Sequence, residues 1–166
     1  MALTNRPRTV SGYGTAAGTG ALAALLLVGV CGSPMYAGWV QDHTDPNGAG
    51  GWFLRLLAWP AWQLHSDDPY QGVLASDLRA ILLVILAVAF LYLLPTSQAA
   101  RVQSSASQFF SGWAAYVLAA GFAALLAALL GPDGSLYAAF QSTGTGATYG
   151  FFAGWIVGTA SLGGRA

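Results

Sequence analysis

Long apolar stretches alternate with short polar ones along this chain. The apolar stretches cover about residues 14–40, 78–94, 109–130 and 146–162. A helix that crosses a membrane needs roughly 20 mainly apolar residues, so each stretch is long enough to span, the last one at the lower limit. The pattern predicts an all-α integral membrane protein, a four-transmembrane-helix bundle that forms a single membrane domain over residues 1–166.

The first apolar stretch contains its own break. Gly32, Ser33 and Pro34 interrupt it, and such residues are tolerated in a membrane helix where neighbouring helices satisfy the freed backbone groups. We therefore expect a kink there. A cleaved signal peptide is the alternative, but cleavage before Gly38 would place Met35 at a position that prefers a small residue. We favour a retained helix.

Small residues recur at every fourth position in the last two stretches. Residues four apart lie on one face of a helix, and small side chains there let two helices approach closely within lipid. The two rows are Ala115, Ala119, Ala123 and Ala127, and Gly146, Gly150, Gly154 and Gly158. We expect the glycine row to pack within the chain, and a partner subunit or a second copy is its alternative occupant.

The predicted outer loop, residues 41–77, contains an aromatic segment at 52–64. This segment is shorter than the roughly 20 residues that a span requires. Tryptophan favours the headgroup level of a membrane, so we predict a short interfacial helix that Pro60 bends or ends. The predicted anchors at the membrane interface are Trp52, Arg55, Trp59 and Trp62.

Composition supports a membrane protein and excludes several other classes. The chain is 55% hydrophobic, its mean hydropathy is +0.57 and only 7% of its residues are charged, against about 25% in soluble domains. Nucleic acid is excluded as a partner because there is no basic patch. The single cysteine, Cys31, excludes an internal disulfide and a CxxC metal or redox site.

The charged residues separate onto two sides of the four-span plan. Arg6, Arg8, Arg101 and Arg165 fall on one side, and all the acidic residues fall on the other with Arg55 and Arg79. Short cytoplasmic loops carry an excess of arginine and lysine. We therefore expect a multi-pass protein of a bacterial-type cytoplasmic membrane, with both the N and C termini cytoplasmic. The acidic residues are Asp42, Asp45, Asp67, Asp68, Asp77 and Asp133.

Residues that carry chemistry are scarce. Arg79 is the only charged residue within the four predicted spans, and it lies near the start of the second one. This scarcity argues against a proton-coupled transporter or a voltage sensor. We expect no cofactor and no haem, because both histidines fall in the loop. The candidate metal ligands are His43, His65, Asp67 and Asp68, whose imidazoles and carboxylates could bind a metal ion. We favour the interpretation that they are solvated polar residues at the ends of the loop. No serine lies in a GxSxG nucleophile motif.

These observations favour a non-catalytic function. We expect a small accessory or assembly subunit of a larger membrane protein complex, with the lipid bilayer and other integral membrane subunits, or further copies of itself, as partners. The alternative is a self-associating pore or small-solute transporter whose glycine faces form the oligomer. A membrane enzyme that uses the outer Asp/His loop is a third, weaker hypothesis.

Overall fold

The computed structural model describes residues 15–62, 70–96, 105–131 and 134–164, and every regular element in these ranges is a helix. The all-α class predicted from the sequence is therefore confirmed. The elements are α1 (Ala16–Leu26), the π-helical turn η2 (Leu27–Cys31), α2 (Pro34–His43), α3 (Ala49–Leu57), α4 (Tyr70–Thr96), α5 (Ser105–Leu130) and α6 (Leu136–Leu162).

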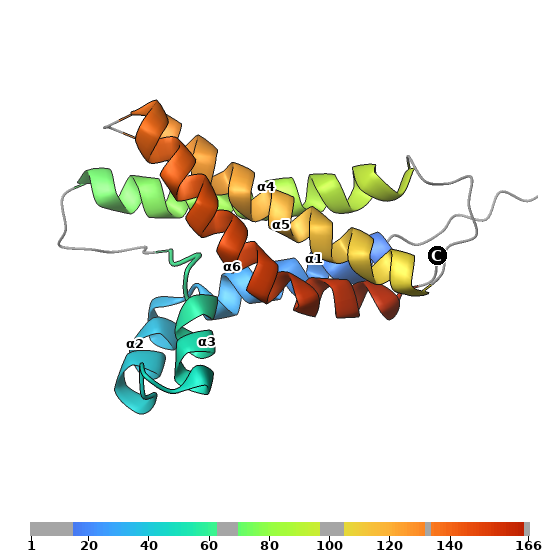
Figure 1. Cartoon of the computed structure of the whole chain (residues 1–166), viewed down its shortest axis with the longest axis horizontal. Coiled ribbons are helices and arrows are strands. Elements are labelled where there is room, and N and C mark those ends of the chain that lie inside the picture. Colours follow the sequence, from blue (N-terminus) through green and yellow to red (C-terminus); the bar gives the residue numbers. More distant parts are fainter. Residues whose placement is uncertain (1–14, 63–69, 97–104, 132–133, 165–166) are drawn as a thin grey trace, which may run out of the picture.

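Four long helices form an elongated bundle, and two short ones project from one end of it (Figure 1). Neighbours along the chain run in opposite directions: α5 packs antiparallel to both α4 and α6, and α1 packs against α6 and α4. The start of α1 lies beside the end of α6, where the backbone of Thr15 contacts Gly164. The short helices α2 and α3 form a hairpin at the opposite end of α1 (Figure 1).

Two helices are long and apolar enough to cross a membrane by themselves. They are Ala75–Leu94, within α4, and Ser105–Leu130, which is α5. Ala16–Cys31 and Pro34–His43 form a third candidate if this pair, bent by 65°, is counted as one broken span. The sixth helix is equally long, but its glycines and threonines lower its hydropathy and it is not among these candidates. The chain is therefore a membrane protein with two or three candidate spans.

Part of what the sequence predicts as loop is helical. The predicted outer loop 41–77 ends early, because α4 already begins at Tyr70, and Ser135–Thr145, predicted as a connection, lies mostly within α6. No proline or glycine pair interrupts either region, so polar residues such as Gln71 and Gln141 continue the helix beyond its apolar part. Hydropathy finds the apolar part of a helix and not its ends.

The first long helix is broken where Gly32, Ser33 and Pro34 predict it. The π-helical turn η2 precedes the break, and Ser33 starts the next helix by accepting a hydrogen bond from the backbone N–H of Tyr36 at 3.2 Å. Pro34 is the first residue of α2, a position where its missing N–H costs nothing. These local signals turn the chain away from the bundle axis.

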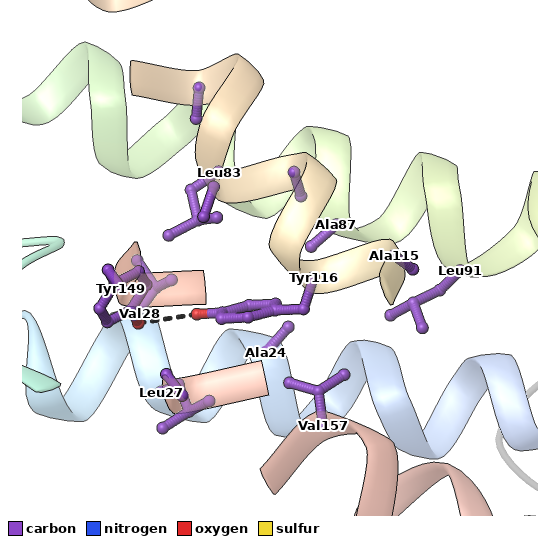
Figure 2. Packing of buried hydrophobic residues seen from close by; sticks show 14 of the residues in the cluster. Ala24, Leu27, Val28, Leu83, Ala87, Leu91, Ala115, Tyr116, Tyr149 and Val157 are labelled. Carbon is purple, nitrogen blue, oxygen red and sulfur yellow. Dashed lines mark hydrogen bonds between the residues drawn. The ribbon is translucent and has the colours of Figure 1, made fainter. Parts of the chain in front are cut away.

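The core lies between the four long helices (Figure 2). Each helix contributes fully buried residues, among them Ala24 of α1, Leu83 of α4, Tyr116 of α5 and Val157 of α6. The first helix is thus an integral part of the core. The other labelled residues of this cluster are Leu27, Val28, Ala87, Leu91, Ala115 and Tyr149.

Candidate functional site

The glycine row of α6 lies directly against α5. At each of the four glycines, a Cβ atom would come closer than 3.0 Å to an atom of α5. Glycine is therefore the only residue that fits without moving one helix away from the other. The facing pairs along this seam are Gly146 with Ala120, Gly150 with Val117, Gly154 with Trp113 and Gly158 with Phe109.

The predicted alanine row of α5 lies on a different face. Its four members are buried, but none of them is among the α5 residues nearest to the glycines. In the core drawn in Figure 2, Ala115 lies near Leu91 and Ala87 of α4. The glycines instead meet the backbone and side chains of neighbouring positions, which are Ala120 and Ala124 toward one end of the seam and Trp113 and Phe109 toward the other.

A pair of tyrosines connects α5 and α6 in the middle of the core. The hydroxyl oxygens of Tyr116 and Tyr149 are 2.8 Å apart, and the two residues are 0% and 1% exposed. Each hydroxyl thereby gains a hydrogen-bonding partner that the apolar surroundings do not offer (Figure 2). Neither tyrosine is among the residues that the sequence predicts as functional. A tyrosine among small residues in the middle of an apolar stretch is the signal that marks each of them.

The predicted anchor Trp62 binds the broken first helix. Its indole Nε1–H donates to the carbonyl oxygen of Val28 at 3.1 Å, and its backbone N–H donates to that of Gly32 at 3.0 Å. A Cβ atom on Gly32 would lie 2.7 Å from the carbonyl oxygen of Pro60. The segment after α3 therefore covers the break. It provides a donor for the Gly32 carbonyl oxygen, because the Tyr36 N–H bonds to Ser33 instead. It also adds a second donor to the Val28 carbonyl oxygen, which accepts from the Gly32 N–H at 3.1 Å.

Arg55 joins the two helices of the projecting hairpin. Its Nη2 donates to the carbonyl oxygens of Thr44 at 3.0 Å and Gln41 at 3.3 Å, and its Nε donates to Thr44 Oγ1 at 3.3 Å. The guanidinium thus satisfies carbonyls at the C-terminal end of α2, where a positive charge also complements the helix dipole. Trp52 is half exposed and packs edge-on against Phe152 of α6, with ring centroids 5.0 Å apart.

Trp59 lies at the junction between the hairpin and the bundle. Its ring stacks on Tyr149 at a centroid distance of 4.8 Å, and the Arg79 guanidinium carbon lies 4.5 Å from the centre of the same ring. Arg79 Nη2 also donates to the Trp59 carbonyl oxygen at 3.0 Å. All four predicted anchors, Trp52 included, therefore make specific contacts within the chain.

A cavity of about 320 Å³ lies next to Arg79 and Trp59. Its other walls come from α5 and α6, including Ala124, Ala127 and the hydroxyl-bearing Thr145. A wider groove of about 710 Å³ shares Trp59 and Thr145 with this cavity and runs between α3 and α6.

The candidate metal ligands are only partly within the described residues. His43 stacks on Trp39 at a centroid distance of 5.5 Å, and its Nδ1 lies 2.9 Å from the Trp39 carbonyl oxygen. His65, Asp67 and Asp68 lie outside the described residues. Over the part of the chain that is described, no group of three or more His, Cys, Asp or Glu side chains is placed to hold a metal ion.

Comparisons with protein-family models, with curated proteins and with solved structures found no match to this chain. The arguments about function therefore rest on the contacts described above.

Proposed function

We propose that this protein is a non-catalytic accessory or assembly subunit of a larger membrane complex. It crosses a bacterial-type cytoplasmic membrane four times, with both termini in the cytoplasm and the α2–α3 hairpin outside. The distribution of arginines between the two sides of the chain supports this orientation.

The fourth span in this proposal is α6. Its 27 residues correspond to about 40 Å of helix, more than the roughly 30 Å of the hydrocarbon layer. It packs closely against the candidate span α5 through the glycine row. The hydroxyl groups of its exposed threonines form hydrogen bonds within the helix. Thr148 Oγ1 donates to the carbonyl oxygen of Gly144 at 2.8 Å, and Thr159 Oγ1 donates to that of Trp155 at 2.6 Å. Such internal bonds make a threonine-containing helix compatible with lipid.

The observation that carries the proposal is the outward face of α2. Met35 is 85% exposed and Trp39 is 49% exposed. No atom lies within 4 Å of the position that a Cβ on Gly38, between them, would take. Spacings of three and four residues place all three on one side of the helix. Exposed methionine and tryptophan on a short helix suit a docking surface, because both bury large contact areas. Arg55 of α3 fixes the position of α2 through its hydrogen bonds to the carbonyl oxygens of Gln41 and Thr44.

The self-associating pore remains the second candidate, but the structure offers it less support. That hypothesis uses the glycine face of α6 for the oligomer, whereas this face is occupied by α5. A pore would need another contact surface. The hypothesis of a membrane enzyme that uses the outer Asp/His loop also gains little support, since the His43 ring stacks on Trp39 and its Nδ1 lies 2.9 Å from the Trp39 carbonyl oxygen.

The test is purification of the tagged protein from its native membrane in a mild detergent or in nanodiscs, followed by identification of whatever accompanies it. We expect larger subunits in a fixed ratio. Trp39→Gln should reduce their recovery several-fold, because it removes the main aromatic contact. Trp155→Gln is the matched control: this tryptophan is also 49% exposed, but it lies on α6. A lone species at a small multiple of 17.1 kDa would reject the proposal and favour the pore.

A further inference from the structure

We propose that the cavity beside Arg79 binds the phosphate group of a phospholipid from the outer leaflet. The proposal needs no partner subunit, since it concerns the isolated chain, and only the choice of the outer leaflet rests on the orientation proposed above. It rests on the state of the Arg79 guanidinium, on the groups around it and on the depth of the cavity in the membrane.

The guanidinium is held in place but its hydrogen-bonding capacity is not used up. Trp59 fixes it from one side, through its ring face and through its carbonyl oxygen. The Nε atom of Arg79 is buried and has no hydrogen-bonding partner among the described residues. Arg79 also lines the cavity, so an acceptor placed there can bind the part of the guanidinium that faces it. An oxyanion is the acceptor that the planar fork of arginine fits best.

The other walls of the cavity suit a phosphate ester. Ser142 of α6 brings a hydroxyl group that can donate to a phosphate oxygen. The Thr145 hydroxyl donates to the Gln141 carbonyl oxygen at 3.4 Å, a long bond that it would exchange for one to the phosphate. Ala124 and Ala127 of α5 form an apolar wall without competing charge. One fixed cation, two hydroxyls and a small apolar wall thus form a compact cradle for a singly charged phosphodiester.

The depth of the cavity selects a lipid as the source of this phosphate. The apolar stretch predicted at residues 78–94 begins directly before Arg79 and directly after Asp77, so Arg79 lies at the end of this stretch. Phospholipid headgroups lie at this level, and arginine reaches them from just inside the hydrocarbon layer. The wider groove, which shares Trp59 and Thr145 with the cavity, has an apolar and aromatic part and a polar part. Trp52, Leu56 and Tyr149 suit the first part of the acyl chains, and Arg55, Gln141 and Thr148 suit the glycerol and its ester oxygens.

The experiment uses the full chain, delipidated in detergent, with native mass spectrometry and tryptophan fluorescence as readouts. Three probes separate the sources: phosphatidylglycerol, a galactosyl diacylglycerol with the same acyl chains but no phosphate, and inorganic phosphate. We expect one tightly held phosphatidylglycerol per chain and much weaker binding of the other two probes. Equal binding of both lipids would overturn phosphate recognition. Inorganic phosphate that displaces the lipid at low millimolar concentration would overturn the lipid as the source.

Substitutions connect the binding to this cavity. Arg79→Gln should weaken phosphatidylglycerol binding by at least about tenfold, the usual scale of a lost charged hydrogen bond. Arg79→Lys keeps the charge but loses the fork, so its binding should be intermediate. Arg101→Gln is the control, because Arg101 falls in the predicted cytoplasmic loop, on the other side of the membrane from Arg79. Unchanged lipid binding in Arg79→Gln would overturn the proposal.

Two further variants test the cavity in case Arg79→Gln does not fold. Thr145→Val keeps the side-chain shape and Ser142→Ala removes one hydroxyl, and neither disturbs the contact between Arg79 and Trp59. Each should weaken phosphatidylglycerol binding by about threefold, in line with the loss of one hydrogen bond. If both variants fold and bind the lipid as tightly as the unmodified protein, the cavity is not the phosphate site.

Discussion

The hydroxyl groups of Tyr116 and Tyr149 lie 2.8 Å apart and form a hydrogen bond between α5 and α6 in the buried core. Tyr149 also stacks on Trp59, which in turn contacts Arg79 of α4. A continuous series of contacts therefore leads from the middle of the bundle to the segment that follows the α2–α3 hairpin. The polar group at the centre of the core and the proposed lipid site at its edge share one aromatic residue.

Removing one tyrosine hydroxyl should destabilise the protein, and removing both should restore much of the loss. Tyr149→Phe leaves the Tyr116 hydroxyl buried without its partner, which costs about 1–2 kcal/mol in a membrane protein. The double variant Tyr116→Phe/Tyr149→Phe leaves no such group. Thermal unfolding in detergent measures the stability of Tyr116→Phe, of Tyr149→Phe and of the double variant. Additive losses in the double variant would show that the two hydroxyls do not depend on each other.

The seam between α5 and α6 should not tolerate even one added methyl group. Gly150→Ala would place a Cβ 2.8 Å from the Cα of Val117, which is backbone and cannot rotate away. We expect a loss of about 1–3 kcal/mol, typical of overpacking. Gly144→Ala on the same helix is the control, because nothing lies within 4 Å of its Cβ position. This control should be neutral or slightly stabilising, since alanine favours the helix. Equal effects of both substitutions would contradict the seam.

Trp62 should stabilise the broken helix through its indole N–H. Trp62→Phe retains an aromatic ring but removes the donor to the Val28 carbonyl oxygen, at a cost of about 0.5–1.5 kcal/mol. Hydrogen exchange of the amides around η2 should become faster. Trp39→Phe, on the exposed face of α2, serves as the control and should leave this exchange unchanged. The role assigned to Trp62 is wrong if the two variants behave alike.

The proposed orientation predicts which cysteines an impermeant reagent can reach. In a Cys31→Ser background, a cysteine at Asn47, between α2 and α3, should react in intact cells. A cysteine at the C-terminal Ala166 should react only after the membrane is opened. The pair also tests α6, because three spans separate the two positions only if this helix crosses. Labelling of both positions from outside would show that it does not.

Local features of the sequence account for the helical class, the membrane character and the break in the first helix. An apolar stretch without breakers forms a helix whatever lies beside it, because its backbone must satisfy its own hydrogen bonds in lipid. The break at Gly32, Ser33 and Pro34 is also local, because these residues end one helix and start the next through their own backbone and side chains. The ends of α4 and α6 could not be predicted, because a polar residue at a helix end leaves no mark in hydropathy.

Only the tertiary structure decides which faces meet. A row of residues four apart drifts around a helix of 3.6 residues per turn, so the crossing of two helices determines which row is opposite which. The glycines of α6 consequently face Val117 and its neighbours and not the alanine row. Likewise, composition marks Trp59 and Trp62 as residues for the membrane interface. Their contacts with Arg79 and Val28 depend on the fold, which brings residues 20 and 34 positions apart in the sequence into hydrogen-bonding distance.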